Sequence, residues 1–382
     1  MLENSKIIND IHRLVREKNR TLNQWEQYYR KDSLESFPQC IQFPTGTRCN
    51  IKCRFCTGRD GENTKSYKDL SLVEFRLIVD NKGWEGAFKR CETVALYGWG
   101  EPLFNQDYEK IFDYIADNFS GLGISICTNG ILFNQKWSEK IIAINNSEVN
   151  FSVNAATKET FRKITGSNQF ERVITNIREL TDLRERHKTK NPHISLSYVA
   201  TTENIRELPQ FVNLSANLKA DSVLVQDIMM LTEDTKRLSL TNEPELACEI
   251  FRLAEEQAKK RRISFLSYVT HQVDYFSKSP ELTIDQNISS QFNTIGNNTV
   301  PSPYFTSTDC FDPWERMMIG ADGEVFPCCR SGYFQGTSFG NIYKQSFLDI
   351  WNGETYRYIR KTINTSNPPQ SCAICPKKAG LS

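Results

Sequence analysis

The sequence lacks a long apolar run and has no excess of either charge. No stretch approaches the roughly 20 apolar residues of a membrane span. Lysine and arginine (47) almost balance aspartate and glutamate (46), so no broad basic field is available to attract nucleic acid or anionic lipid. Residues 1–6 are polar and charged, unlike a secretion signal. These features predict a cytoplasmic protein without nucleic-acid or membrane partners.

Histidine is also scarce. The four histidines, His12, His187, His193 and His271, show no spacing typical of a metal site or a catalytic triad. Cysteine, in contrast, occurs 12 times. Because no secretion signal is present, these cysteines are expected to serve as metal ligands in a reducing compartment and not as disulfides.

At 382 residues the chain can bury a large core and form two domains. Short β-branched runs alternate with amphipathic helical patterns. The predicted strands are 40–44, 93–97, 124–128, 149–153, 194–199 and 223–228. The clearest predicted helices are 72–79, 108–118, 170–186 and 245–261. Because strands that alternate with helices form parallel sheets through right-handed crossovers, the pattern predicts an α/β fold, a partial (β/α)6 TIM-like barrel.

Composition divides the chain into four expected segments. Residues 1–36 show apolar residues at helical spacing and are interpreted as a surface helical extension, in preference to a partner-binding element. Residues 37–269 would form the barrel. Residues 270–309, rich in Ser, Thr, Asn and Pro, are interpreted as a linker or lid. Residues 310–382 would form a small second domain.

The spacing of three cysteines is the most informative feature of the sequence. Cys49, Cys53 and Cys56 are separated by three and two residues, and no cysteine or histidine follows them before Cys91. A structural zinc site would need a fourth nearby ligand to complete its tetrahedron. Three thiolates can instead bind three irons of a four-iron, four-sulfur cluster and leave the fourth iron without a protein ligand. The spacing therefore favours a cluster with an open iron.

This loop, including the aromatic Phe55 just before the third cysteine, resembles the signature of the radical S-adenosylmethionine (SAM) superfamily. The resemblance implies that the open iron chelates the amino and carboxylate groups of SAM. It also implies that the reduced cluster cleaves SAM to a 5′-deoxyadenosyl radical, which removes a hydrogen atom from an unactivated carbon. An electron donor such as flavodoxin or ferredoxin is expected as a partner. Since the loop follows the first strand, we expect it at the carboxyl ends of the barrel strands.

A second motif follows the second predicted strand. Residues 97–102, Tyr-Gly-Trp-Gly-Glu-Pro, are similar to the family's Gly-Gly-Glu-Pro motif, with Trp99 as the departure. Glycine allows the backbone to approach a ligand closely, and a carboxylate accepts hydrogen bonds from an amino group. The resemblance implies that Gly98, Gly100 and Glu101 hold the amino group of SAM.

The later strands contribute further candidates. Ser152 and Asn154 alternate onto one face at the end of the fourth strand and stand where the family often has Ser-x-Asp. The resemblance makes them candidates to bind the ribose or carboxylate of SAM, with Asn154 in place of an acid. Val199 on the fifth strand is the candidate to contact adenine, and ordinary barrel core is its alternative. The turn at residues 128–130 is assigned no chemistry.

The C-terminal region contains a second cysteine set, which can saturate a cubane cluster or a zinc ion. Its members are Cys310, Cys328, Cys372 and Cys375. Their spacing and the surrounding motifs resemble the SPASM auxiliary-cluster domain in its shortened "twitch" form. Asp322-Gly323 predicts a hairpin turn that would bring the first two of these cysteines together across a β-ribbon. Because no cysteine follows the last of them, one fully protein-ligated four-iron cluster is expected, with Cys329 spare.

The resemblance does not identify the substrate, and our leading hypothesis is an oxidoreductase that acts on a small polar metabolite, such as a sugar or aminocyclitol. The twitch spacing is similar to that of aminocyclitol dehydrogenases, and an auxiliary cluster could accept the electron of a substrate radical. Epimerisation is an alternative in which a cysteine returns hydrogen to the substrate. The available donors, each of which also fits a buried small hydrophobe, are Cys40, Cys91, Cys127, Cys248 and Cys329.

Two other functions stay open from the sequence. Maturation of a ribosomally made peptide is one, because SPASM-type domains are widespread in such enzymes, although no peptide-recognition module is evident. An iron-sulfur electron carrier is the other. Such a carrier would need neither the open iron nor the loop around Glu101, which favours an enzyme.

Overall fold

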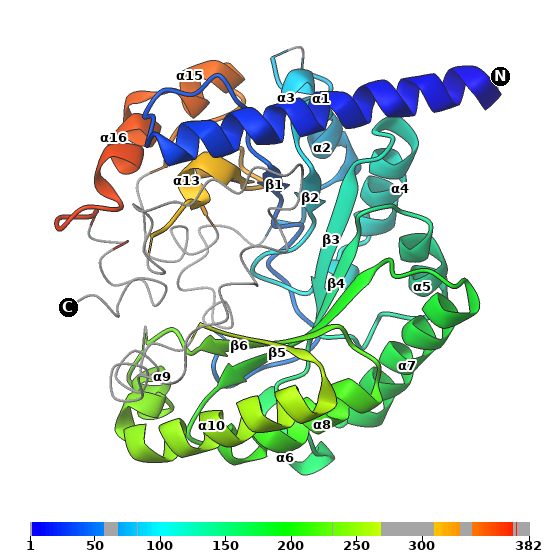
Figure 1. Cartoon of the computed structure of the whole chain (residues 1–382), viewed down its shortest axis with the longest axis vertical. Coiled ribbons are helices and arrows are strands. Elements are labelled where there is room, and N and C mark those ends of the chain that lie inside the picture. The colour runs from blue at the N-terminus through cyan, green and yellow to red at the C-terminus, as the bar shows by residue number, and fades with distance from the viewer. Residues whose placement is uncertain are drawn as a thin grey trace.

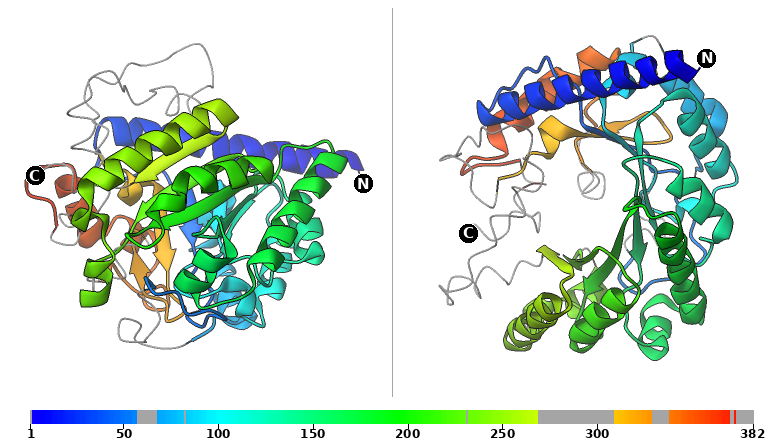
Figure 2. Two further views of the ribbon diagram at one scale, coloured as in Figure 1. Left: turned by 90° about the horizontal axis from the view of Figure 1, so that it is seen from below. Right: turned by 45° about the vertical axis from the view of Figure 1, so that its right-hand side comes forward.

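One curved sheet with helices on its outer side forms the centre of the molecule (Figures 1 and 2). The computed structural model describes residues 2–56, 68–81, 83–230, 232–268, 309–328, 338–369 and 372. In the described residues the strand order is β7-β6-β5-β4-β3-β2-β1-β8-β9. The strands are β1 (Cys40–Gln42), β2 (Thr93–Ala95), β3 (Gly123–Thr128), β4 (Glu148–Ser152), β5 (His193–Ala200), β6 (Ser222–Asp227), β7 (Ser264–Tyr268), β8 (Arg316–Ile319) and β9 (Val325–Phe326).

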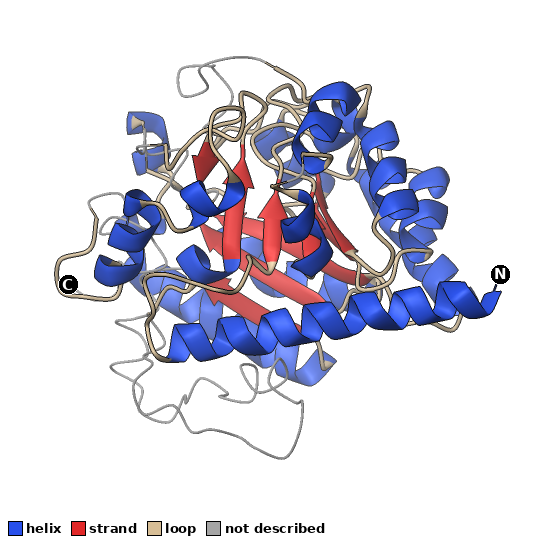
Figure 3. Ribbon diagram, turned by 90° about the horizontal axis from the view of Figure 1, so that it is seen from above, coloured by secondary structure: helices blue, strands red, loops and turns tan. Residues whose placement is uncertain are grey.

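Helices connect the parallel strands and cover the convex side of the sheet, as the blue helices around the red strands show (Figure 3). None of the described helices is long and apolar enough to cross a membrane. The helices of the barrel are α2 (Leu72–Val79), α3 (Glu85–Arg90), α4 (Tyr108–Asn118), α5 (Gln135–Ile142), α6 (Lys158–Thr165), α7 (Phe170–Arg186), α8 (Leu208–Asn217), α9 (Glu233–Arg237) and α10 (Pro244–Arg261). The flanking helices are α1 (Leu2–Tyr28), α13 (Asp312–Glu315), α15 (Phe347–Trp351) and α16 (Glu354–Thr362).

The predicted partial barrel is confirmed, and the sheet extends beyond the six predicted strands. Strands β1 to β6 are parallel and pair in chain order. The sequence analysis did not predict β7, which adds a further parallel strand beside β6. At the other edge β8 pairs parallel to β1, so the C-terminal region continues the barrel sheet. Strands β8 and β9 of the expected second domain therefore belong to the same sheet as the barrel strands.

Alternating side chains give the sheet two different faces. On β4, Val149 and Phe151 are completely buried against the helices. Glu148, Asn150 and Ser152 alternate with them and lie on the opposite, concave side, which we call the inner face. The outer face thus forms the hydrophobic core, whereas the inner face is available for polar chemistry.

The N-terminal region connects the barrel to the C-terminal region. Helix α1 packs against α3 and α13, and it ends at Tyr28, short of the predicted boundary at residue 36. The amide of Asn23 donates to the Trp314 carbonyl (2.8 Å), and the indole of Trp351 donates to the Ser36 carbonyl (2.8 Å). Both contacts are buried. Residues 1–36 therefore hold the two regions together.

The predicted hairpin in the C-terminal region is confirmed. Strands β8 and β9 are antiparallel, with Met318 opposite Phe326. Gly323 lies in the turn with a φ of 81°, a conformation that favours glycine. The predicted linker or lid at 270–309 lies outside the described residues, apart from residue 309.

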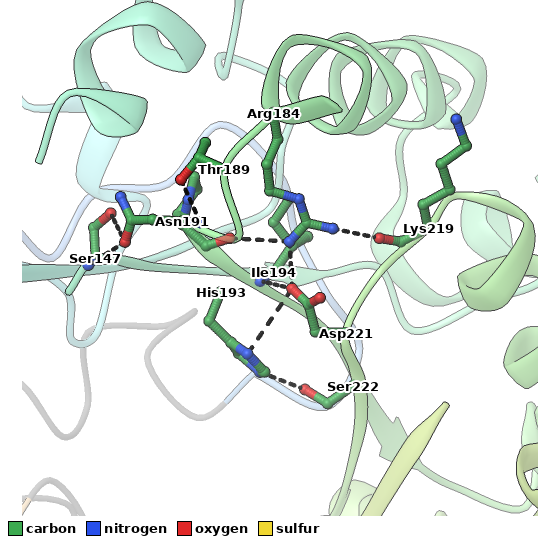
Figure 4. Close-up of polar contacts among 10 residues, drawn as sticks. Ser147, Arg184, Thr189, Asn191, His193, Ile194, Lys219, Asp221 and Ser222 are labelled. Carbon is green, nitrogen blue, oxygen red and sulfur yellow. Dashed lines mark hydrogen bonds and ion pairs between the residues drawn. The ribbon is translucent and has the colours of Figure 1, made fainter. Parts of the chain in front are cut away.

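At the amino ends of β5 and β6, a buried arginine of α7 joins the segments that lead into these two strands (Figure 4). The guanidinium of Arg184 donates to the carbonyls of Pro192 (3.0 Å) and Lys219 (2.7 Å) and pairs with Asp221. The Asp221 carboxylate also accepts the backbone N–H of Ile194 (2.7 Å). Because active sites of barrels lie at the opposite, carboxyl edge, this network has a role in stability.

Replacing Arg184 with methionine is expected to lower the free energy of unfolding by about 2–4 kcal/mol, because buried acceptors lose their charged donor. Chemical denaturation would measure this change. The control is Arg252→Met, which removes an exposed pair with Glu256 on α10 and should cost at most about 0.5 kcal/mol. Equal stability of the two variants would contradict a stabilising role for the Arg184 network.

Candidate functional site

The three closely spaced cysteines lie on the loop after β1, at the carboxyl edge of the sheet. The backbone N–H of Lys52 donates to the Thr165 carbonyl (3.1 Å), and that of Arg54 donates to the Ile164 carbonyl (2.9 Å). These acceptors belong to the last turn of α6, whose carbonyls have no partner within the helix. The C-terminal end of α6 therefore fixes the middle of the cysteine loop.

The surface of the loop is open to a ligand. Cys49 and Cys56 are exposed, whereas Cys53 and Phe55 are half-buried. No group of three or more His, Cys, Asp or Glu side chains in the described residues converges on a single metal ion. In a four-iron cluster each thiolate binds a different iron, so the thiolates need not converge on one point. The open loop thus suits a cluster better than a single ion.

The electrostatics of the loop favour protonated thiols when no metal is bound. Although one side of Cys49 is exposed, the protein atoms packed around its other side partly desolvate the thiol and raise its pKa to about 11, opposed by a hydrogen bond from the Ile51 backbone. Burial also raises the pKa of Cys53, together with the charges of Cys56 and Cys49. Because metal ligation requires thiolates, cluster assembly at this loop would release protons.

Gly98 and Gly100 are required by contacts within the protein. A Cβ on Gly98 would lie 2.4 Å from the Cβ of Pro44, and one on Gly100 would lie 2.4 Å from the carbonyl oxygen of Arg48. The N–H of Glu101 donates to that same Arg48 carbonyl (2.9 Å). The two glycines therefore let the loop after β2 pack against the start of the cysteine loop. The close backbone approach predicted for SAM is seen here between two segments of the chain.

Glu101 is buried, with 3% of its surface exposed. Its carboxylate accepts hydrogen bonds from the Thr128 hydroxyl (2.6 Å), the Asn129 N–H (2.7 Å) and the Leu103 N–H (3.2 Å). Burial raises the pKa of Glu101 to about 7, and these three hydrogen bonds oppose the rise. A carboxylate has about four acceptor positions, two on each oxygen. Oε1 accepts from Thr128 and Leu103, whereas Oε2 accepts from Asn129 alone and can accept from one more donor.

Asn129 connects the cysteine loop to Glu101, a role that the sequence analysis did not assign. Its side-chain amide donates to the Asn50 side chain (2.7 Å) and lies 3.9 Å from the sulfur of Cys49. Its backbone N–H donates to Glu101, as described above. The only sequence signal was its position in a turn at the end of the third strand. Strand pairing brings this turn beside the cysteine loop.

Ser152, Asn154 and Val199 lie together at the same edge. The Asn154 amide donates to the Ser152 hydroxyl (2.9 Å) and its side-chain oxygen accepts the Val199 N–H (2.7 Å). Asn154 is 1% exposed, lies beyond the end of β4, and has a φ of 64°. It therefore links the ends of β4 and β5, while Ser152 and Val199 remain half-buried on the inner face.

The second cysteine set lies around the β8–β9 hairpin. Cys310 is buried shortly before α13, and its backbone exchanges hydrogen bonds with the Asn364 side chain (2.9 and 3.1 Å). Cys328 follows β9 and is half-buried, as is Cys372. Cys375, like the spare Cys329, lies outside the described residues. Because β9 runs antiparallel to β8, Cys328 lies towards the amino end of β8, the end that Cys310 precedes.

The residues present fit the implied cofactors. The cysteine loop offers three thiols and no fourth protein ligand, as an open iron requires. The hydroxyl of Thr47, two residues before Cys49, is buried without a hydrogen-bond partner. An unpaired buried hydroxyl costs about 1–3 kcal/mol, which a polar ligand at this edge could recover.

Two family profiles match the sequence in the regions just described. The profile of the Radical SAM superfamily matches residues 43–215, which contain the cysteine loop and the loop of Glu101. The profile of SPASM, an iron-sulfur cluster-binding domain, matches residues 310–376, which contain the second cysteine set. Together the two matches cover more than half of the chain.

Three relatives match the sequence at moderate identity. A tungsten-containing aldehyde ferredoxin oxidoreductase cofactor-modifying protein of Pyrococcus furiosus is 26% identical over 349 residues, covering 86% of this chain and 85% of the relative. An AdoMet-dependent heme synthase of Methanosarcina barkeri is 24% identical over 371 residues, covering 91% and 90%. A GTP 3′,8-cyclase of Desulforamulus reducens is 32% identical, over 44% of this chain and 52% of the relative.

Solved structures share the fold. Streptococcus suis SuiB bound to S-adenosylmethionine superposes with a TM-score of 0.64 at 17% identity, covering 91% of this chain and 73% of SuiB. Native anSMEcpe with bound AdoMet gives a TM-score of 0.55 at 17% identity, covering 84% and 82%. The two profiles and the fold agree with the two cysteine sets. The chain therefore belongs to the radical SAM superfamily as an enzyme with a C-terminal SPASM domain, whose cofactors are SAM and iron-sulfur clusters.

Proposed function

We propose that this radical SAM enzyme removes a hydrogen atom from a small polar metabolite, such as a sugar or aminocyclitol, and oxidises it. The observation that carries the proposal is the placement of the two cysteine sets on neighbouring strands. The loop with Cys49 follows the carboxyl end of β1, and Cys310 and Cys328 lie towards the amino end of β8, which pairs with β1. A substrate on the inner face would therefore lie between the two cysteine sets, with one set at the carboxyl end of the strands and the other at the amino end.

The residues at the carboxyl edge have separate roles in this proposal. Cys49, Cys53 and Cys56 would hold the cluster that, with SAM and an electron from flavodoxin or ferredoxin, supplies a hydrogen-abstracting radical. Glu101 would accept the amino N–H of SAM at its remaining acceptor position. Ser152 would bind the ribose or carboxylate.

The auxiliary site would complete the oxidation. A substrate that becomes a ketone loses one hydrogen atom to the SAM-derived radical, one hydroxyl proton to solvent or a base, and one electron. The second cysteine set would hold the cluster that accepts this electron. Iron-sulfur potentials span roughly −700 to +450 mV and depend on their surroundings, so such an acceptor is chemically reasonable.

Anaerobic turnover in deuterated buffer tests the proposal. Candidate polyols and aminocyclitols would be incubated with reconstituted enzyme, SAM and dithionite, and 5′-deoxyadenosine and product would be measured by mass spectrometry. Oxidation predicts a product two hydrogens lighter than the substrate. An isomer carrying one carbon-bound deuterium would instead establish epimerisation and refute the dehydrogenase proposal.

The structure narrows the donors available to an epimerase. Cys40 and Cys127 alternate onto the inner face and are half-buried. Cys91 is completely buried before β2, and Cys248 lies on α10, outside the sheet. Of the described candidates, Cys127 is nearest in sequence to the turn that contacts Cys49. If the deuterated isomer forms, Cys127→Ala is the first variant to examine.

Peptide maturation is the second candidate function. It is favoured by the fold shared with SuiB in its complex with the precursor peptide SuiA, which has a TM-score of 0.60 at 14% identity. Genes next to this one discriminate between the two proposals. A short precursor-peptide gene would favour maturation, whereas sugar-modifying enzymes would favour a small substrate.

Replacing Asn129 with alanine is expected to weaken SAM binding about 5-fold, because Asn50 and Cys49 lose the side-chain amide that holds the cysteine loop, and one hydrogen bond contributes about 1 kcal/mol. Equilibrium dialysis of SAM and the electron paramagnetic resonance (EPR) spectrum of the reduced cluster would show this. Asn118→Ala, on the exposed end of α4, is the control. Unchanged affinity and spectrum in Asn129→Ala would refute a positioning role.

A further inference from the structure

A row of small polar side chains crosses the inner face of the sheet below the proposed SAM edge. Each member is the register partner of the next across β3 to β7. We call it the polar row, and its residues are Cys127, Asn150, Ser195, Ser222 and Ser264. Parallel barrels usually fill this position with branched apolar residues, so a polar row is an unusual use of the interior.

Two neighbouring members of the row have unused hydrogen-bonding capacity. The side-chain oxygen of Asn150 and the hydroxyl of Ser195 are both buried without a hydrogen-bond partner. Ser195 is 4% exposed. The two residues are directly paired on adjacent strands, whose backbones lie roughly 4.8 Å apart. Each unpaired group costs about 1–3 kcal/mol, so the pair is matched to a ligand that donates hydrogen bonds.

The row lies at a suitable depth for a substrate. Asn150 precedes Ser152 by two residues on β4, and Ser195 precedes Ser197 by two on β5. Two residues of a strand span about 6–7 Å. A ligand at the row would therefore lie directly below the proposed ribose contact at Ser152.

The charge of the inner face limits the ligand class. On this face of the described strands, Glu148 and Arg316 are the residues with a formal charge. Ser125 donates to Glu148 (3.3 Å), and Arg316 lies 3.8 Å from the sulfur of Cys40. A triphosphate would need several cations here, and a porphyrin would need a broad apolar surface. Neither feature is present on the described strands.

We propose that Asn150 and Ser195 bind hydroxyl or amide N–H groups of an uncharged polar substrate, such as a polyol or an acetamido sugar. This inference rests on the proposed function and assigns a recognition site to it. The Asn150 oxygen can only accept, whereas the Ser195 hydroxyl can donate and accept. The pair therefore selects a ligand with a hydrogen-bond donor for Asn150 and, next to it, a group that can accept a hydrogen bond from Ser195.

The test uses reconstituted holoenzyme with SAM bound and four probes: myo-inositol, N-acetylglucosamine, GTP and hemin. Binding would be followed by anaerobic calorimetry in wild type, Ser195→Ala and Asn150→Leu. We expect at least one neutral probe to bind wild type and to bind each variant at least 10-fold more weakly. Ser215→Ala, which removes a buried hydroxyl on α8 that donates to Phe211 (2.8 Å), is the control and should leave probe binding unchanged.

Thermal unfolding adds a readout that does not depend on the probe. Because the two polar groups are unpaired without ligand, both variants should melt at or above the wild-type temperature. Variants that melt several degrees lower would show that the groups are already satisfied, and this would overturn the proposal. It would also be overturned if neither neutral probe binds, if the variants bind as wild type does, or if GTP or hemin binds instead. SAM affinity and 5′-deoxyadenosine formation report separately on the proposed function.

Discussion

Replacing Cys49, Cys53 and Cys56 together with alanine is expected to abolish 5′-deoxyadenosine formation. Iron content should fall from about eight to about four atoms per chain after anaerobic reconstitution, since each cysteine set is proposed to hold one four-iron cluster. The fold should persist, because the loop is exposed and is held through backbone contacts of Lys52 and Arg54. Iron analysis, product chromatography and circular dichroism would measure these three effects.

Cys248→Ala is the matched control, since this half-buried cysteine lies on α10, away from both cysteine sets. It should keep full iron content and activity. If the triple variant still formed 5′-deoxyadenosine, the assignment of the loop would be wrong. If zinc replaced the remaining iron, the assignment of the second set to an iron-sulfur cluster would be rejected.

Replacing Glu101 with glutamine is expected to weaken SAM binding about 10- to 100-fold. The variant loses a charged acceptor, and hydrogen bonds to charged groups contribute about 1.5–3 kcal/mol. The amide also places a donor where Thr128, Asn129 and Leu103 already donate. Anaerobic equilibrium dialysis with labelled SAM would measure the affinity.

The pH dependence adds a distinct expectation for Glu101. Its pKa is raised to about 7 by burial. Between the ordinary carboxyl pKa and about 7, the folded protein keeps the Glu101 proton, whereas the unfolded chain releases it. This proton therefore contributes fully to the stability of the fold at low pH, and its contribution is lost as the pH rises through about 7. SAM binding should instead favour the ionised form of Glu101, because a carboxylate accepts the amino N–H of SAM more strongly than a protonated carboxyl group does. Wild-type affinity should fall as the pH drops below about 7, and the affinity of Glu101→Gln should not follow this titration.

Glu26 provides the control for this second prediction. Like Glu101 it is 3% exposed, and it accepts the backbone N–H groups of Glu35 (2.6 Å) and Ser36 (3.2 Å) far from the cysteine loop. Glu26→Gln should change the free energy of unfolding by about as much as Glu101→Gln does, and it should leave SAM affinity unchanged. If both variants lost SAM affinity equally, the effect of Glu101 would be structural and not a direct contact.

Local sequence patterns were sufficient to predict most of the fold. The helices α2, α4 and α7 occupy the predicted ranges, because a 3.6-residue apolar period is a property of the segment itself. The turn at Gly323 was predictable for the same reason, since its positive φ depends on a local residue type. Strand β7 was missed because its run 264–268 contains two serines and no β-branched residue, and its side chains are exposed or only partly buried. The pairing of β8 with β1 joins segments 276 residues apart in register, and no local pattern encodes such a contact.

The sequence by itself predicted the class of chemistry from three cysteines close enough to share one cluster, four more that can complete a second, and the loop of Glu101. Covalent spacing limits which thiols can bind one inorganic group, so these predictions needed no coordinates. Only the tertiary structure decided that Asn129 contacts the cysteine loop and that Asn150 and Ser195 stand unpaired side by side on the inner face. Hydrogen bonds between strands depend on register and curvature, which arise from packing the whole sheet against its helices and are not properties of any one segment.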